Sequence, residues 1–308
     1  MSRMPKDNKN PIAELLQNNL DRRDLLTGAA GLAATVLGAG QASAMGHERP
    51  KVDLAPEDKI GKAVGDGAQI LITGANRGLG LEFTRQYAER GAKIIATARN
   101  PESADELNEL ASKNSNIIVE QLDVTDHARI DELAAQYQDT PIDLLLNNAG
   151  ISGDINAQVF GRFGYDVFDL VMAVNVKGPV KMCEAFYKQV RASELKKMVT
   201  VSSSQGSIAS VNSPMSYWYR ASKSAVNMLM VNIALAVQRK KVIVGLVTPG
   251  ITATDFIPQN VQDFLNKQRP GLMQTPEGAA ADMIRNIDRF SVENSGTFFD
   301  YTGDIVPW

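Results

Sequence analysis

From residue 69 onward, the chain alternates short apolar runs with longer amphipathic stretches. The apolar runs are nearly continuous instead of alternating with polar residues, which is typical of strands buried on both faces. They predict strands at residues 69–73, 93–98, 117–121, 142–147, 197–202 and 242–248. The stretches between them predict helices that include residues 79–90, 102–112, 128–138 and 221–239.

Strands separated by helices favour right-handed βαβ units, in which the strands of one sheet run parallel. The sequence shows no internal repeat and no second apolar system. We therefore expect an α/β fold, namely a single doubly wound Rossmann domain of roughly 240 residues with a mostly parallel sheet flanked by helices.

The composition of the 308 residues excludes several classes of protein. The 32 Lys and Arg residues nearly balance the 35 Asp and Glu residues. The formal net charge of −3 therefore gives no excess of positive charge that would bind nucleic acid. A single cysteine rules out an internal disulfide framework and a cysteine-rich metal site. The two histidines, His47 and His127, have no neighbours at metal-ligand spacing. We therefore expect no metal and no nucleic acid.

The segment at residues 25–47 contains no Asp, Glu, Lys or Arg. Such a run reaches the ~20 residues of a transmembrane helix, but its glycines would weaken that helix. It follows a twin arginine, Arg22-Arg23, and contains a small-x-small site, Ala42-Ser43-Ala44. These features resemble a twin-arginine export signal. Asp21 departs from the usual pattern, which has Ser or Thr there.

This interpretation divides the chain into three parts. Residues 1–44 are a signal peptide, residues 45–66 are a charged linker containing Pro and Gly, and residues 67–308 are the folded domain. It predicts a periplasmic protein that is exported already folded and meets a membrane only through its export signal. A membrane-anchored protein and a cytoplasmic protein with an unstructured leader are the alternatives.

A glycine-rich turn joins the first predicted strand to the first predicted helix, and it reads Thr73-Gly74-Ala75-Asn76-Arg77-Gly78-Leu79-Gly80. Gly74 allows a sharp turn, Gly78 lets the backbone approach a phosphate, and Gly80 lets the helix pack close to the sheet. A pyrophosphate would then lie at the N-terminus of the helix, where free N–H groups and the helix dipole favour anions. The turn therefore predicts a dinucleotide site.

The end of the second predicted strand bears on the choice of dinucleotide. An NAD site usually places an acidic residue there, which accepts a hydrogen bond from the ribose 2′-hydroxyl. Here Ala98 holds that position and Arg99 follows it, while Arg77 lies inside the glycine turn. Guanidinium groups suit a 2′-phosphate because they carry a full charge and forked donors. We expect NADP(H) to be preferred over NAD(H), the alternative being two arginines that only face solvent.

Further motifs follow in a fixed order along the chain. They are Leu122-Asp123-Val124, Asn147-Asn148-Ala149-Gly150, Asn175, Ser203 with Gly206, Tyr219-Arg220-Ala221-Ser222-Lys223 and Thr248-Pro249-Gly250 with Thr254. Together with the spacing of the glycine turn, they resemble the short-chain dehydrogenase/reductase family over residues 67–308. The resemblance implies that the catalytic residues are Asn175, Ser203, Tyr219 and Lys223. It implies that the cofactor-binding residues are Gly74, Asn76, Arg77, Gly78, Leu79, Gly80, Arg99, Asp123, Val124, Asn148, Ala149, Gly150, Tyr219, Lys223, Pro249, Gly250 and Thr254.

The family mechanism gives each catalytic residue a role. Tyr219 and Lys223 are four residues apart and lie on one helix face. A phenol titrates near ~10, and a neighbouring ammonium should lower the pKa of Tyr219 toward neutrality. Tyr219 would protonate a carbonyl oxygen or deprotonate an alcohol, and Ser203 would polarise that oxygen. Asn175 would hold a helix distortion and a water that links Lys223 to solvent, while the hydride comes from the nicotinamide.

Neighbouring residues compete for two of these roles. The residue four positions after Tyr217 is Ala221, so only Tyr219 has a lysine one helical turn further along, Lys223. Ser202 and Ser204 flank Ser203, which is preferred because the family serine precedes the glycine by three residues, as Ser203 precedes Gly206.

The gap between Ser203 and Tyr219 predicts an enlarged loop at residues 207–216 over the active site. This gap, the glycine turn and the closing segment at residues 296–308 resemble the branch of sniffer-like carbonyl reductases and C-factor proteins. Residues 256–273 predict either a substrate lid or a plain surface connection.

The resemblance implies an NADP-dependent oxidoreductase that reduces an aldehyde or ketone to an alcohol, or carries out the reverse reaction. Its partner would be a small-molecule carbonyl or alcohol substrate, and a homo-oligomer is compatible with the family. The alternative is a non-catalytic nucleotide-binding signalling protein of the C-factor type.

Overall fold

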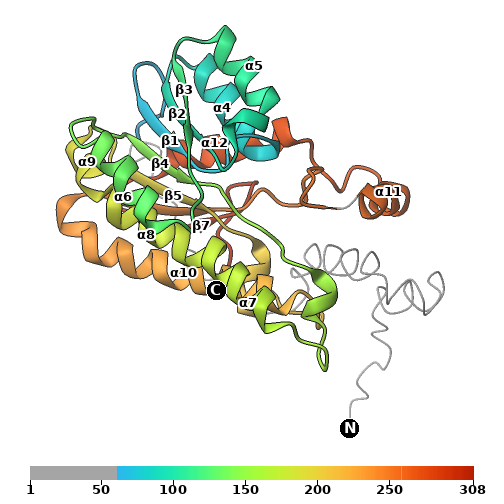
Figure 1. The fold of residues 1–308 in the computed structure, drawn as a ribbon. Helices are drawn as coiled ribbons and strands as arrows, with labels where there is room; N and C mark the ends of the chain where they lie inside the picture. Colours follow the sequence, from blue (N-terminus) through green and yellow to red (C-terminus); the bar gives the residue numbers. More distant parts are fainter. Residues whose placement is uncertain (1–60, 258) are drawn as a thin grey trace.

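The computed structural model describes residues 61–257 and 259–308. Their strands form one sheet that is parallel throughout, in the order β3-β2-β1-β4-β5-β6-β7 (Figure 1). The strands are β1 (Gln69–Ile72), β2 (Lys93–Ala98), β3 (Ile117–Gln121), β4 (Leu144–Asn147), β5 (Lys197–Val201), β6 (Ile243–Val247) and β7 (Phe298–Phe299). This architecture confirms the predicted single α/β Rossmann domain.

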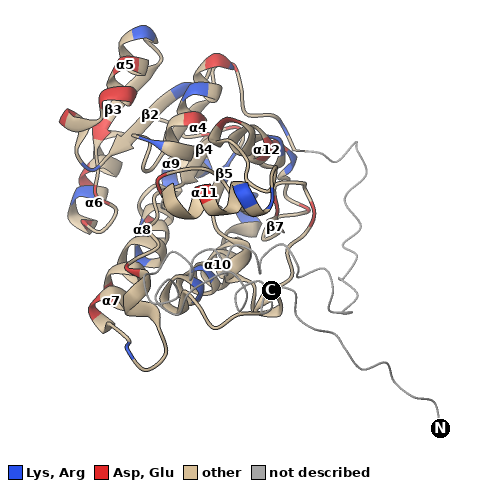
Figure 2. Cartoon of the chain, turned by 90° about the vertical axis from the view of Figure 1, so that its right-hand side faces the viewer, with Lys and Arg blue, Asp and Glu red and all other residues tan. Residues whose placement is uncertain are grey.

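Helices cover both faces of the sheet. They are α4 (Gly78–Glu89), α5 (Asp105–Lys113), α6 (His127–Gln136), α7 (Tyr165–Met172), α8 (Gly178–Ala185), α9 (Tyr187–Ala192), α10 (Tyr217–Val237), α11 (Gln259–Gln268) and α12 (Pro276–Arg289). One apolar core lies between the sheet and α4, α5 and α12, and a second lies between the sheet and α6, α8 and α10 (Figure 1). Basic and acidic residues are interspersed along the outer helices α5 and α6 (Figure 2).

The central strands follow the sequence pattern closely because their burial is complete, whereas the edge strand β3 is largely exposed or half-buried. Every residue of β4, β5 and β6 is buried, as the continuous apolar runs predict. The short strand β7 has no such signal. Its two residues are held by pairing with Leu246 and Val247 of β6, a contact between distant parts of the chain.

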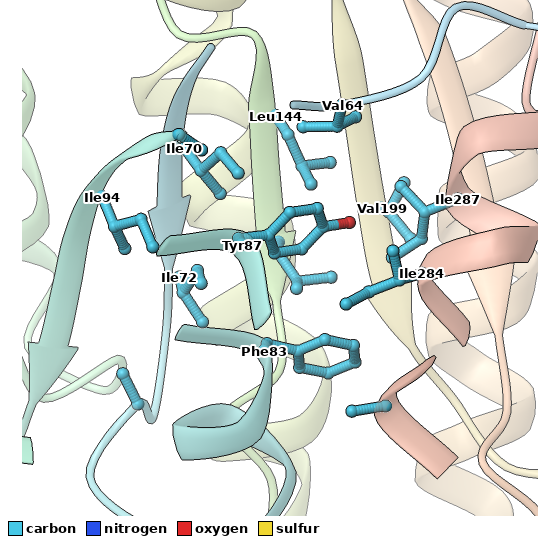
Figure 3. Packing of buried hydrophobic residues seen from close by; sticks show 14 of the residues in the cluster. Val64, Ile70, Ile72, Phe83, Tyr87, Ile94, Leu144, Val199, Ile284 and Ile287 are labelled. Carbon is cyan, nitrogen blue, oxygen red and sulfur yellow. The ribbon is translucent and has the colours of Figure 1, made fainter. Parts of the chain in front are cut away.

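Aromatic packing fixes α4 against the sheet (Figure 3). Phe83 and Tyr87 have no exposed surface and lie between the sheet and Ile284 and Ile287 of α12. Burying such a side chain contributes about 1.5–3 kcal/mol. Because the glycine turn leads directly into α4, this packing also sets the position of the turn.

Residues at the beginning of the described part pack on α12. Val64 is fully buried and its N–H donates to Asp288 Oδ1 at 2.8 Å. The Lys197 ammonium is buried and donates to the carbonyls of Lys62, Ile287 and Asp288 at 2.8–3.1 Å. The chain is therefore already tied to the domain before residue 67. The predicted signal at residues 1–44 lies outside the described residues. Among those described, no helix is both long and apolar enough to cross a membrane.

Candidate active site

A cavity of about 940 Å³ opens beyond the carboxyl ends of the central strands. The chain reverses its winding between β1 and β4, and such switch points form ligand crevices in open parallel sheets. Every residue that the sequence predicts to bind the cofactor lines this cavity, and so do Ser203, Tyr219 and Lys223. Asn175 does not line it and lies buried behind the wall.

The glycine turn adopts a conformation that depends on its glycines. Gly74 and Gly78 have φ values of 67° and 53°, in the left-handed region that favours glycine. A Cβ atom on Gly80 would lie 2.0 Å from the Gly74 carbonyl oxygen. The first turn of α4 has neither a side-chain cap nor an acidic residue, which leaves its N–H groups available to an anion. The turn therefore fits a pyrophosphate.

Asn148 braces this turn from the end of β4. Its side-chain Nδ2 donates to the carbonyls of Thr73 and Gly74, both at 3.0 Å. The backbone N–H groups of Asn148 and Ala149 donate to Thr73 Oγ1 at 3.0 and 3.1 Å. These hydrogen bonds join the carboxyl ends of β1 and β4, so Asn148 holds the glycine turn in place against the end of β4.

Two guanidinium groups lie at the cavity wall near the end of β2. Arg99 is exposed and directly follows the buried Ala98. Arg77 is also exposed, with Nη1 3.4 Å from Asp255 Oδ2, a weak ion pair in water. Asp123 lines the same part of the cavity and accepts hydrogen bonds from the backbone and hydroxyl of Thr125. Both arginines are exposed at the cavity wall, and the ion pair of Arg77 with Asp255 is weak enough to give way to an anionic group.

Helix α10 and the end of β5 bring the candidate catalytic groups together. Tyr219 lies in the first turn of α10, and its phenol hydrogen-bonds the side chain of Ser203, two residues beyond β5. The Lys223 ammonium lies one turn further along, 5.7 Å from the centre of the Tyr219 ring. It donates to the Val201 carbonyl at 3.0 Å. The competing Tyr217 does not line the cavity.

Asn175 supports the site from a distorted helix. It lies within a π-helical turn, Ala173–Lys177, between α7 and α8. Its Oδ1 accepts from the Ile151 N–H at 2.9 Å, and its Nδ2 donates to the Ile151 carbonyl at 2.8 Å and to Ser222 Oγ at 3.0 Å. This π-helical turn is the helix distortion expected at Asn175. Such turns often mark functional sites.

The protonation of Tyr219 differs from the expectation that Lys223 lowers its pKa. Burial raises the pKa of Tyr219 to about 12, and the hydrogen bond with Ser203 opposes this only in part. Burial also lowers the pKa of Lys223 to about 8, and its ammonium points to the Val201 carbonyl. The Tyr219 phenol is consequently protonated at neutral pH, the state that a proton donor requires.

The far end of the cavity is apolar. The Phe256 ring lies 5.5 Å from the Tyr219 ring, and Ile257 and Leu272 continue this wall from the predicted lid segment. Ile257 packs in a small cluster with Val261 and Leu265, so the segment has its own apolar core.

Sequence patterns missed one wall of the cavity. The tail residues Ile305, Val306 and Pro307 line it, beside the enlarged loop that contributes Ala209 and Ser210. The Ala209 N–H donates to the Trp308 carbonyl at 3.0 Å, which ties the loop to the tail. The sequence predicts the loop at residues 207–216 over the active site, whereas the tail has no local pattern that places it there. Among the described residues, no group of three His, Cys, Asp or Glu side chains could hold a metal ion.

The fold and this site define a class of protein. Residues 68–264 match the short chain dehydrogenase family, and the chain belongs to that family of oxidoreductases. An uncharacterised oxidoreductase of Schizosaccharomyces pombe is 31% identical over 248 residues, which cover 77% of this chain and 97% of the relative.

Solved structures of carbonyl reductases are similar to this one. The NADPH-bound carbonyl reductase from chicken fatty liver is 26% identical, with a TM-score of 0.70 over 79% of this chain and 100% of that chain. The carbonyl reductase Sniffer of D. melanogaster is 25% identical, with a TM-score of 0.68 and the same coverage.

Proposed function

We propose that this protein is an NADP-dependent carbonyl reductase that converts an aldehyde or ketone to an alcohol. One observation carries the proposal. A buried and protonated phenol, Tyr219, hydrogen-bonds Ser203 in the same cavity that contains the glycine turn. A proton donor and a dinucleotide cradle in one cavity are what carbonyl reduction by a nicotinamide needs.

Each catalytic side chain has a defined task in this proposal. Ser203 and Tyr219 would both hydrogen-bond the substrate oxygen, and Tyr219 would give its proton to that oxygen as the alcohol forms. Lys223, with a pKa of about 8, can exchange protons near neutral pH and would restore the proton of Tyr219. The bound nicotinamide would supply the hydride.

The position of the arginines supports NADP as the cofactor. Arg99 lines the cavity at the end of β2, where a nucleotide in the glycine turn would place its adenosine ribose, and Arg77 lines the cavity from the glycine turn itself. The resemblance to the NADPH-bound chicken enzyme points the same way.

Replacing Arg99 by Asp tests this cofactor choice. We expect Arg99→Asp to lower kcat/KM for NADPH by roughly 10- to 100-fold, because a charge-assisted contact to the 2′-phosphate is lost. The efficiency with NADH should stay equal or rise. Arg239→Asp, on an arginine that does not line the cavity, is the control. Equal losses with both cofactors would contradict the proposed role of Arg99.

The apolar far end of the cavity favours an uncharged substrate. Phe256, Ile257 and Leu272 offer carbon surface beside Tyr219. A carboxylate group placed against this carbon surface would lose its hydration. We therefore propose neutral aldehydes and ketones as substrates.

We further propose that residues 1–44 direct the folded protein to the periplasm. The twin arginine, the uncharged segment and Ala42-Ser43-Ala44 support this. N-terminal sequencing of the protein purified from its native cells should show that the mature chain begins at Met45. A native protein beginning at residue 1 or 2 would contradict cleavage and favour the cytoplasmic or membrane-anchored alternative.

A further inference from the structure

Gln158 is a buried glutamine that connects a distant loop to the first turn of α10. It ends the 3₁₀ turn Ile155–Gln158, and only 1% of it is exposed. Its Oε1 accepts from the Tyr219 N–H at 3.0 Å. Its Nε2 donates to the carbonyls of Ser152 and Asp154 at 2.9 and 3.2 Å. Both ends of the amide are thus satisfied.

The first turn of α10 needs such a partner. The first N–H groups of a helix have no acceptor within the helix, and a preceding side chain usually supplies one. Here Ser216 precedes α10 with a left-handed φ of 52° and makes no side-chain cap bond. Gln158, which is 61 residues away in the sequence, takes this role at the N–H of the residue that carries the phenol.

The segment that contains Gln158 is tied to both sides of the active site. Ile151, at its beginning, makes the paired hydrogen bonds with Asn175. Near its end, the Trp218 indole N–H donates to the Gly164 carbonyl at 3.0 Å, and the Phe163 and Trp218 rings lie 4.6 Å apart. A shift of Gln158 would therefore move the first turn of α10 relative to β5 and Ser203.

We propose that Gln158 is a positioning residue that sets the place of the Tyr219 phenol against Ser203 and the substrate oxygen. Gln158 does not itself line the cavity, but it hydrogen-bonds two residues that do, Ser152 and Tyr219. It acts by fixing the backbone of Tyr219. The glycine turn, by contrast, lies on other elements, so a shift of Gln158 should affect cofactor binding less than it affects the placement of the phenol.

The variant Gln158→Met tests this inference, which rests in part on the proposed function. With NADPH and para-nitrobenzaldehyde as probes, we expect kcat to fall roughly 10- to 100-fold, because a misplaced proton donor slows the chemical step. KM for NADPH should change less than about twofold, because the glycine turn that holds the nucleotide lies on other elements. Gln158→Asn, whose amide is one methylene shorter, should show the same split with a smaller loss of thermal stability.

A second readout does not depend on turnover. In protein with isotope-labelled tyrosine rings, the Tyr219 resonance is assigned by its absence from Tyr219→Phe. It should shift in both Gln158 variants, because the phenol leaves its hydrogen bond with Ser203. A wild-type protein inactive toward the probe would count against the proposed function, while this resonance would still test the placement of Tyr219.

The control is another buried glutamine. Gln189 in α9 is 4% exposed, donates to the Ala134 carbonyl at 2.7 Å and does not line the cavity. Gln189→Met should lower stability yet leave kcat and the Tyr219 resonance unchanged. An unmoved Tyr219 resonance in the Gln158 variants would overturn the inference. So would equal losses of kcat and NADPH affinity in the Gln158 and Gln189 variants, because that result indicates a general structural role.

Discussion

Tyr219→Phe should lower kcat for carbonyl reduction by about 10²- to 10⁴-fold, the usual contribution of a general acid. The substitution removes only the hydroxyl group and leaves a buried ring of the same shape beside Phe256. The thermal midpoint should therefore stay close to that of the wild type, and the affinity for NADPH should fall far less than kcat. Steady-state kinetics, nucleotide titration and thermal unfolding measure the three quantities.

The chain provides a matched control two residues earlier. Tyr217 begins the same helix, but Ala221 stands four residues after it and its ring packs on Phe163, away from the cavity. Tyr217→Phe should leave kcat within about twofold, as expected for a residue outside the reacting groups. Turnover that survives in Tyr219→Phe, or that is lost equally in Tyr217→Phe, would show that the wrong phenol has been assigned.

Gly80→Ala should destabilise the protein and weaken nucleotide binding together. The new methyl group would lie 2.0 Å from the Gly74 carbonyl oxygen, a backbone contact that cannot be relieved without moving the turn, and 2.7 Å from Asn148 Nδ2. Overpacking of this kind costs on the order of 1–3 kcal/mol. A displaced turn should also lower NADPH affinity at least about tenfold, a loss of roughly 1.4 kcal/mol of binding energy.

A second glycine separates this steric effect from helix propensity. Gly278 is the third residue of α12, as Gly80 is the third residue of α4, and a Cβ on Gly278 would meet only Thr275 Oγ1 at 3.4 Å. Gly278→Ala should be neutral or slightly stabilising, since alanine is the better helix former. Urea unfolding and NADPH titration of both variants make the comparison. A Gly80→Ala protein that binds NADPH like the wild type would contradict the assignment of the turn.

The parts of the structure that follow from local sequence were predicted from it. The strands β1, β2, β4, β5 and β6 have nearly continuous apolar runs, and the helices α4, α5, α6 and α10 have helical spacing, so burial and periodicity identify them. The glycine turn depends on backbone freedom at Gly74 and Gly78, which the residue type itself reveals. Lys223 follows Tyr219 by one helical turn, and that spacing is visible in the sequence.

The parts that depend on contacts between distant segments were not predicted. The strand β7 exists because two phenylalanines pair with β6, and the tail reaches the cavity through the bond between Ala209 and Trp308. The high pKa of Tyr219 reflects burial, which the spacing of Tyr219 and Lys223 cannot reveal. Gln158 gives no signal either, because a glutamine in a loop is ordinarily exposed.

The central claim is that this cavity reduces a carbonyl group with NADPH, and a direct assay of the purified protein tests it. The protein should be incubated with NADPH or NADH and a panel of neutral aldehydes, ketones and quinones, with matched keto acids included. Oxidation of the nicotinamide is followed by absorbance, and the alcohol product is identified by mass spectrometry. We predict NADPH-dependent formation of an alcohol from at least one neutral carbonyl, lost in Tyr219→Phe. Tight NADPH binding without turnover of any compound would contradict the account and favour a nucleotide-binding signalling protein.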